Sequence, residues 1–158
     1  WLMQKEDVER LTARGDAVLV SSRGKAQLVM SSVVSERNNI CAVRYHSAGG
    51  ESHYMISLHK NSFSHTLVLQ SRVFVVNFIS GMNDTVDFAG SVSGRMVDKM
   101  KHLELEAEDG VKIDCFSLKS ARGFIECSVV HEFSLGDHTL FVGKILHARV
   151  REMRNGKM

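Results

Sequence analysis

The stretch from Gly123 to Val150 constrains the fold more than any other part of the chain. Two runs rich in β-branched and aromatic residues flank a short break that contains Gly136 and Asp137. This is the pattern of an antiparallel β-hairpin. Each strand is mostly apolar on one side and mixed on the other, which suits a barrel wall or an interface. Gly143, inside the second run, indicates a bulge or a close approach by another backbone or a ligand.

Length and composition favour one globular domain that covers residues 1–158. The chain is 44% apolar and 24% charged, as soluble globular proteins usually are. Its net charge of +2 is too small to indicate a nucleic-acid partner, and no apolar run is long enough to predict a membrane span. Cys41, Cys115 and Cys127 are odd in number and far apart. They predict reduced thiols in a cytoplasmic protein.

Further strands and a few helices are predicted along the rest of the chain. Turns are expected at Arg23–Lys25 and at Asn38–Asn39, so that the first two strands form a hairpin. Together with the long hairpin, these elements predict a closed or partly open antiparallel barrel. The predicted strands cover 17–22, 27–34, 40–46, 53–59, 73–79 and, weakly, 111–118. The predicted helices cover 4–12 and 62–71, with one or two short ones within 80–100.

A possible anion site lies between the strand over 53–59 and the helix that follows it. This segment reads His59-Lys60-Asn61-Ser62-Phe63-Ser64-His65-Thr66. A helix N-terminus offers unpaired N–H groups and a positive dipole end, and hydroxyl, amide and ammonium groups beside it complete a plausible phosphate cradle. The alternative is an ordinary helix cap with an exposed lysine. No P-loop or Gly-x-Gly-x-x-Gly pattern is present.

Two other polar segments leave functional and structural interpretations open. Asn38–Asn39, ahead of an apolar strand, either bond the edge of a planar ligand or form a turn. His138, just after the hairpin turn, is either a functional donor at the barrel mouth or a partly exposed turn residue. Cys41 is expected to be a small buried hydrophobe rather than a nucleophile, because no sequence feature lowers its pKa.

Metal and serine-hydrolase chemistry receive no support from the sequence. The eight histidines never adopt His-x-x-x-His or His-Glu-x-x-His spacing, so no metal site is predicted. No Gly-x-Ser-x-Gly elbow supports a Ser/His/Asp triad.

The strands and polar segments described above, taken in their order along the chain, resemble the flavin reductase-like family of FMN-binding split barrels. This family includes flavoredoxins and NAD(P)H:flavin oxidoreductases. The resemblance spans nearly the whole chain, and the pieces over 74–78 and 136–143 are its most specific parts. The loop over 45–52 departs from the family pattern, because glycines stand where proline is usual. The matching pieces are Ala17–Ser22, Asn39–Val43, Phe74–Phe78, Ser93–Lys99, Glu126–Cys127 and Gly136–Gly143.

The resemblance implies a mainly β fold, an antiparallel split β-barrel of Greek-key type with a few short helices. It also implies a homodimer with one FMN per subunit near the dimer interface. The phosphate would lie at about Lys60–Ser64 and the flavin ring along Asn39–Ser47, while Asp98–Lys99 and the turn at Gly136–His138 would approach the flavin or the nicotinamide.

The implied function is a flavin reductase or flavoredoxin that passes electrons from NADH or NADPH through FMN to an acceptor. The alternatives are an electron-transfer module that serves a protein partner, and a split-barrel binding protein that has lost flavin. His138 is the expected catalytic residue, because it would help to position the hydride donor. The expected FMN-binding residues are Asn39, Ile40, Cys41, Ala42, Val43, His46, Ser47, His59, Lys60, Asn61, Ser62, Ser64 and Lys99.

Overall fold

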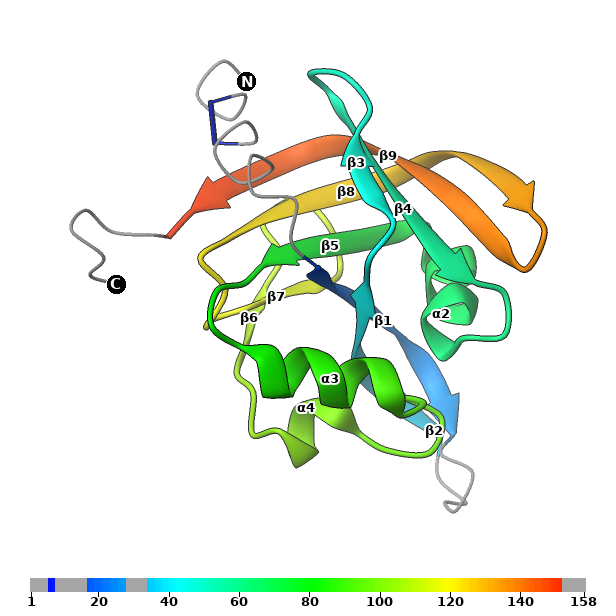
Figure 1. Ribbon diagram of the computed structural model, residues 1–158, viewed down its shortest axis with the longest axis vertical. Coiled ribbons are helices and arrows are strands. Elements are labelled where there is room, and N and C mark those ends of the chain that lie inside the picture. The colour runs from blue at the N-terminus through cyan, green and yellow to red at the C-terminus, as the bar shows by residue number, and fades with distance from the viewer. Residues whose placement is uncertain (1–5, 8–16, 28–33, 152–158) are drawn as a thin grey trace.

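The computed structural model describes residues 6–7, 17–27 and 34–151. Nine strands and three helices are defined in this part of the chain (Figure 1). The helices are α2 (Phe63–Ser71), α3 (Asn83–Ser91) and α4 (Lys99–His102). The strands are β1 (Val18–Gln27), β2 (Val34–Val43), β3 (His46–Ala48), β4 (His53–His59), β5 (Val73–Phe78), β6 (Ala107–Asp109), β7 (Phe116–Leu118), β8 (Gly123–Leu135) and β9 (His138–Val150).

Seven of the strands form one curled antiparallel sheet in the order β2-β1-β5-β8-β9-β4-β3. Its two edge strands, β2 and β3, follow each other in the chain and are separated only by Arg44 and Tyr45. The two edges are therefore joined by the covalent chain rather than by a strand ladder, and a hydrogen bond of 2.9 Å from Ser57 N to Tyr45 O extends the β3–β4 pairing into this junction. This arrangement confirms the predicted mainly β split barrel with a few short helices.

The long C-terminal hairpin is confirmed. β8 and β9 pair from Gly123 and Val150 to the turn, where Gly136 adopts a φ of +64°. A Cβ atom at Gly143 would lie 2.6 Å from Cys127 Cβ and 2.7 Å from Phe74 Cζ. Close packing across the sheet therefore requires a glycine here, and a register shift lies beside it on β8, between Val129 and His131.

The turn predicted at Arg23–Lys25 is wrong, because β1 runs straight through Gly24 to Gln27. A Cβ atom at Gly24 would lie 2.8 Å from Leu67 Cδ2 on α2. This glycine therefore makes room for a helix instead of bending the chain. The connection from β1 to β2 and most of the helix predicted over 4–12 lie outside the described residues.

The break predicted at Asn38–Asn39 is also wrong, because both residues lie within β2. Tertiary hydrogen bonds hold the two amides: Asn38 Oδ1 accepts from Arg23 Nε, and Asn39 Nδ2 donates to Ser22 Oγ. The strand predicted over 111–118 shrinks to β7, which pairs only with the short β6. The strand over 53–59 and the helix capped by Ser62 are confirmed.

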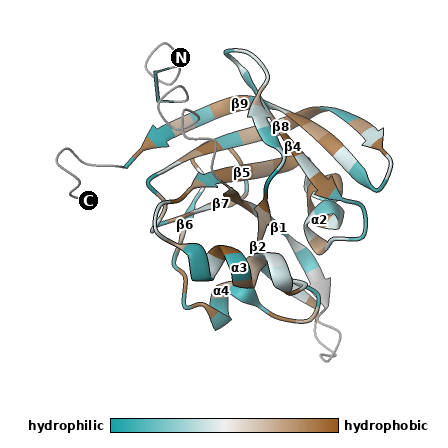
Figure 2. Cartoon of the chain, in the orientation of Figure 1, coloured by the Kyte–Doolittle hydropathy of each residue, from teal (hydrophilic) through white to brown (hydrophobic). Residues whose placement is uncertain are grey.

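Two apolar clusters fill the two faces of the sheet. Successive residues of β1 point to opposite faces, so Leu19 and Val20 belong to different clusters, as do Val75 and Val76 on β5. Hydrophobic residues accordingly run along β1, β5 and β8 (Figure 2). The helix α3 packs on β2, and α2 packs on β1. The two helices therefore stand on either side of the place where the sheet is split.

Candidate functional site

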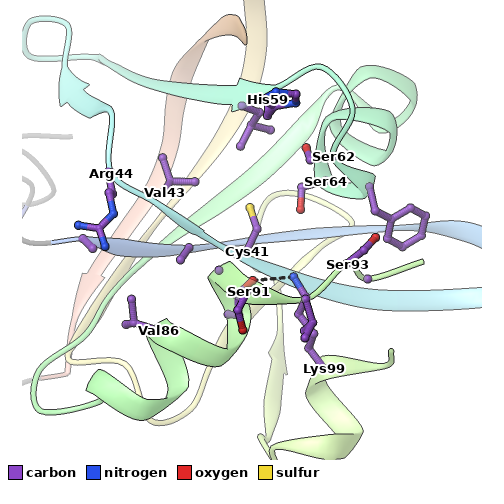
Figure 3. A pocket seen from close by; sticks show the side chains of 18 of the residues that line it. Cys41, Val43, Arg44, His59, Ser62, Ser64, Val86, Ser91, Ser93 and Lys99 are labelled. Carbon is purple, nitrogen blue, oxygen red and sulfur yellow. Dashed lines mark hydrogen bonds between the residues drawn. The ribbon is translucent and has the colours of Figure 1, made fainter. Parts of the chain in front are cut away.

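A cleft of about 640 Å³ lies at the split, between the end of β2, the end of β4 and the helix α3 (Figure 3). Its volume falls in the range of about 300–1,000 Å³ that small-molecule and cofactor sites occupy. One end is rich in hydroxyl groups, the middle is formed by β2, and the other end carries Arg44. The segments that line it include 41–45, 57–59, 61–64, 86–87 and 89–94.

The hydroxyl-rich end lies at the N-terminus of α2. Ser62 caps this helix, since its Oγ accepts from His65 N at 3.0 Å. Ser64, in the first turn, is buried, and its Oγ accepts a hydrogen bond from Asn39 Nδ2 at 2.8 Å. The first N–H groups of a helix have no acceptor within the helix, and the helix dipole makes this end positive. This end of the cleft therefore suits an anion.

Gly94 closes the hydroxyl-rich end against β2. A Cβ atom here would lie 2.1 Å from Asn39 Oδ1 and 2.7 Å from Phe63 Cδ2. Any side chain at this position would force Asn39 or Phe63 to move. The glycine therefore allows the loop after α3 to approach the Asn39–Ser64 hydrogen bond.

Lys99 supplies a buried ammonium group to the cleft. Its Nζ donates to Ile40 O at 3.0 Å and to Ala89 O at 2.8 Å, so it ties β2 to α3. Burial lowers the pKa of Lys99, while the nearby Cys41 opposes this shift. Two carbonyl oxygens solvate the ammonium in place of water, and it lines the same cleft as Ser62 and Ser64.

The middle of the cleft is formed by Cys41, Ala42 and Val43 of β2. Cys41 is half-buried and lies between the hydroxyl-rich end and Arg44 (Figure 3). Burial raises the pKa of its thiol, against smaller opposing effects of Ser64 and Lys99. The group is therefore held as a neutral thiol, which fits a small apolar residue better than a nucleophile.

Two histidines and a carboxylate stand at the mouth of the cleft. His138 Nδ1 is 2.8 Å from Asp137 Oδ1, and His59 Nε2 is 3.7 Å from Asp137 Oδ2. The hydrogen bond to His138 lowers the pKa of Asp137. Tyr45 is 69% exposed, and its ring centroid lies 6.1 Å from that of His138. The mouth thus combines oriented imidazoles with an accessible aromatic ring.

The structure brings most of the predicted site residues together, and three lie elsewhere. His46 is hydrogen-bonded to the Tyr54 hydroxyl, and Ser47 is exposed on β3. The ammonium of Lys60 is hydrogen-bonded to Ser134 Oγ on β8 and does not line the cleft. Asn39 and Ile40 contribute through Ser64 and Lys99, respectively. The predicted residues that line the cleft are Cys41, Ala42, Val43, His59, Asn61, Ser62, Ser64, Lys99 and His138.

Sequence reasoning missed the contribution of α3, and it did not name the individual residues at the junction between β2 and β3. Val86, Gly90 and Ser91 line the cleft from α3, and Arg44 and Tyr45 line it from the junction. The family-like piece over 93–99 was the one available signal for the α3 side. Arg44 and Tyr45 fall within the segment 39–47 that the resemblance assigns to the flavin ring, but neither was predicted as a binding residue.

The described residues contain neither a metal-binding cluster nor a membrane-spanning helix. No group of three or more His, Cys, Asp or Glu side chains in this part of the chain is arranged to hold a metal ion. No helix within the same residues is long and apolar enough to cross a membrane.

The fold and the cleft define a split-barrel domain with a small-molecule site at its seam. Residues 13–158 match the model of the flavin reductase like domain, and the chain therefore belongs to the flavin reductase-like family. This membership confirms the resemblance seen in the sequence.

Solved structures share this fold, and curated relatives match part of the chain. An FMN-binding protein from Thermus thermophilus, solved with bound 1-cyclohex-2-enone, is 26% identical with a TM-score of 0.72, covering 89% of this chain and 75% of that one. A flavoredoxin from Methanosarcina acetivorans is 24% identical with a TM-score of 0.74, covering 89% and 72%. An uncharacterized protein of Archaeoglobus fulgidus is 37% identical over 94 residues, covering 58% of this chain and 52% of the relative. The chain spans about half the length of the curated relatives it matches.

Proposed function

We propose that the chain binds FMN in the cleft and passes electrons from NADH or NADPH through it to an acceptor. One observation carries the proposal: a single cleft joins an anion-suited end at Ser62 and Ser64 to the edge of an apolar strand at 41–43. FMN has the same two parts, a phosphate and a planar ring. Membership of the flavin reductase-like family supports the same ligand.

The hydroxyl-rich end would hold the phosphate. The first N–H groups of α2 and the hydroxyl groups of Ser62 and Ser64 would donate hydrogen bonds to it. Lys99 is the buried cation on the lining of the cleft. Lys60, expected from the sequence to neutralise the phosphate, would first have to leave Ser134 Oγ. We therefore assign the larger electrostatic role to Lys99.

The β2 segment and the mouth would orient the two reactants. Bound FMN would supply the hydride- and electron-transfer chemistry, so the chain needs no nucleophile of its own. Backbone groups over 41–43 would bind the ring edge, and α3 would keep water from its other side. His138 is oriented by Asp137 through Nδ1, which leaves its Nε2 to position the nicotinamide donor.

Binding by site variants tests the placement of FMN. We expect Ser64→Ala to raise the dissociation constant for FMN about tenfold, because a charge-assisted hydrogen bond is lost and Asn39 loses the shorter of its two hydrogen bonds. Lys60→Ala is the matched control and should change it by less than about threefold, equivalent to a surface ion pair. Equal effects of the two substitutions would contradict this placement.

Anaerobic reduction tests the activity. The flavin absorption of the FMN-loaded protein is followed after addition of NADH and, separately, of NADPH. Bleaching by either nucleotide is the expected result and identifies the donor. If the flavin absorption bands persist with both nucleotides, the protein is an electron carrier that another protein reduces, and not a reductase. A chain that takes up no FMN at all would overturn the proposal.

The homodimer implied by the family resemblance is part of the same proposal. Sedimentation equilibrium of the FMN-loaded protein should give twice the mass of the chain. If the protein is a monomer at all concentrations, the dimer proposal is wrong, but the assignment of FMN to the cleft is unaffected.

A further inference from the structure

A second cleft, of about 520 Å³, lies beside the outer half of β2, between that strand, α4 and β6. None of its lining residues lines the first cleft. Its walls carry two arginines, Arg23 and Arg37, while Met100, Leu105 and Ala107 contribute apolar surface. The proposed flavin function uses none of these side chains.

Arg37 is the unusual member of this cleft. It is only 6% exposed, and its Nε and Nη1 atoms are buried with no hydrogen-bond partner among the residues that the structure describes. Its Nη2 lies 3.9 Å from Asp98 Oδ2, which is beyond hydrogen-bonding distance. A buried guanidinium without acceptors is costly, because water cannot replace the missing partners. Arg37 therefore has strong donors without acceptors at the wall of a cleft.

The neighbouring Arg23 shows that this fold can give each nitrogen of an arginine an acceptor. Its Nε donates to Asn38 Oδ1 at 2.7 Å, and its two terminal nitrogens each lie 3.0 Å from a carboxylate oxygen, of Asp114 and of Asp109. Those two carboxylates are thus already engaged. The contrast between the two arginines is specific to their positions and does not reflect a lack of acidic residues nearby.

Asp98 does not satisfy Arg37 either. Its Oδ1 caps α4 by accepting from Lys101 N at 3.2 Å. Its remaining interaction with Arg37 is the long 3.9 Å contact. Turning the guanidinium toward the cleft would therefore break no short hydrogen bond. The turn would present Nε and a terminal nitrogen side by side, in the fork that binds phosphate and carboxylate groups.

We propose that this second cleft binds a small organic anion, a phosphate or carboxylate group attached to a body with an apolar face. Arg37 binds the charged group in a forked, bidentate manner, and Lys101, exposed on the rim, adds a second positive charge. Met100, Leu105 and Ala107 contact the apolar body. The exposed Glu36 is the rim carboxylate that selects against more highly charged ligands. The site is independent of flavin binding.

Calorimetric titration of the FMN-saturated protein, in a buffer without other oxyanions, tests the proposal. FMN blocks the anion-suited end of the first cleft, and the part of the binding that depends on Arg37 reports on the second cleft. The probes are inorganic phosphate, AMP and benzoate. We expect at least one organic anion to bind more tightly than inorganic phosphate, and AMP against benzoate distinguishes a phosphate from a carboxylate ligand.

Arg37→Met and Arg37→Lys are compared with Arg149→Met, which removes an exposed arginine from β9. Arg37→Met should raise the dissociation constant at least tenfold, Arg37→Lys by less, and Arg149→Met not at all. Circular dichroism verifies that each variant is folded. Absence of binding by all three anions, or equal binding by the folded Arg37→Met protein, would overturn the proposal.

The FMN titration that precedes these measurements separates the two hypotheses. If the chain takes up no FMN, the same anions are titrated into Ser64→Ala, in which the first cleft is impaired. Binding that still depends on Arg37 would support the second site while the flavin function fails. FMN uptake without Arg37-dependent anion binding would support the flavin function and overturn the second site.

Discussion

Replacing Gly94 by alanine tests whether the hydroxyl-rich end of the cleft is built as described. The new Cβ atom would lie 2.1 Å from Asn39 Oδ1 and 2.7 Å from Phe63 Cδ2. Both side chains are buried, so neither can move into solvent without loss of contacts. Asn39 would have to leave Ser64 Oγ and Ser22 Oγ, which its Nδ2 contacts at 2.8 and 3.3 Å.

The expected destabilisation follows from these contacts. Two buried hydrogen bonds contribute about 1 kcal/mol each, and overpacking adds about 1 kcal/mol or more. We therefore expect Gly94→Ala to lower the free energy of unfolding by about 2–4 kcal/mol, measured by urea titration. The folded fraction should bind FMN at least tenfold more weakly, since the displaced Asn39 no longer holds Ser64.

Two other glycines provide matched controls. At Gly90 a Cβ atom would meet only Ala42 Cβ, at an ordinary 3.5 Å, so Gly90→Ala should leave stability unchanged or slightly raised. Gly143→Ala clashes with Cys127 and Phe74 away from the cleft, and should destabilise the fold without a specific loss of FMN affinity. A Gly94→Ala protein with the stability and FMN affinity of the parent chain would refute the reasoning.

Three further predictions concern buried and half-buried groups. Arg37→Met should leave the free energy of unfolding, measured by urea titration in anion-free buffer, equal or higher, because it removes donors that lack partners. A decrease of more than about 2 kcal/mol would show that Arg37 forms a structural ion pair with Asp98. Burial lowers the pKa of His65, so the unfolded chain binds protons more readily; stability should fall as pH drops through the ordinary histidine range, and His65→Gln should flatten this dependence, while an unchanged slope would contradict it. Iodoacetamide should label Cys41 slowly, and more slowly still with FMN bound; equal rates with and without FMN would place the ligand elsewhere.

Local patterns predicted the elements whose structure depends on neighbouring residues. The alternating residues of β4, the Ser62 cap of α2 and the turn at Gly136 all follow from local backbone and side-chain preferences. The errors occur where a contact with a residue distant in sequence determines the local conformation. Gly24 has the composition of a turn, yet it lies in a strand because Leu67 of α2 needs the space.

In the candidate site, too, some residues could be predicted from local sequence, whereas others are placed by contacts distant in sequence. Ser62 and Ser64 could be predicted because a helix N-terminus has a recognisable local pattern. Lys60 lies beside them in sequence, but the long β8–β9 hairpin brings Ser134 to its ammonium and draws it away from the cleft. Arg44 lines the cleft, and Arg37 is buried without acceptors, because of how the sheet edge meets α3 and α4. No local pattern contains that information.

The most direct test of the central claim is an equilibrium titration of the purified chain with FMN, followed by flavin fluorescence and repeated with Ser64→Ala and Gly94→Ala. The account predicts saturable binding of one FMN per chain, which Ser64→Ala weakens about tenfold and Gly94→Ala at least tenfold. Absence of binding would remove the flavin function from this split barrel. Binding that neither substitution alters would place FMN outside the cleft between β2, α2 and α3.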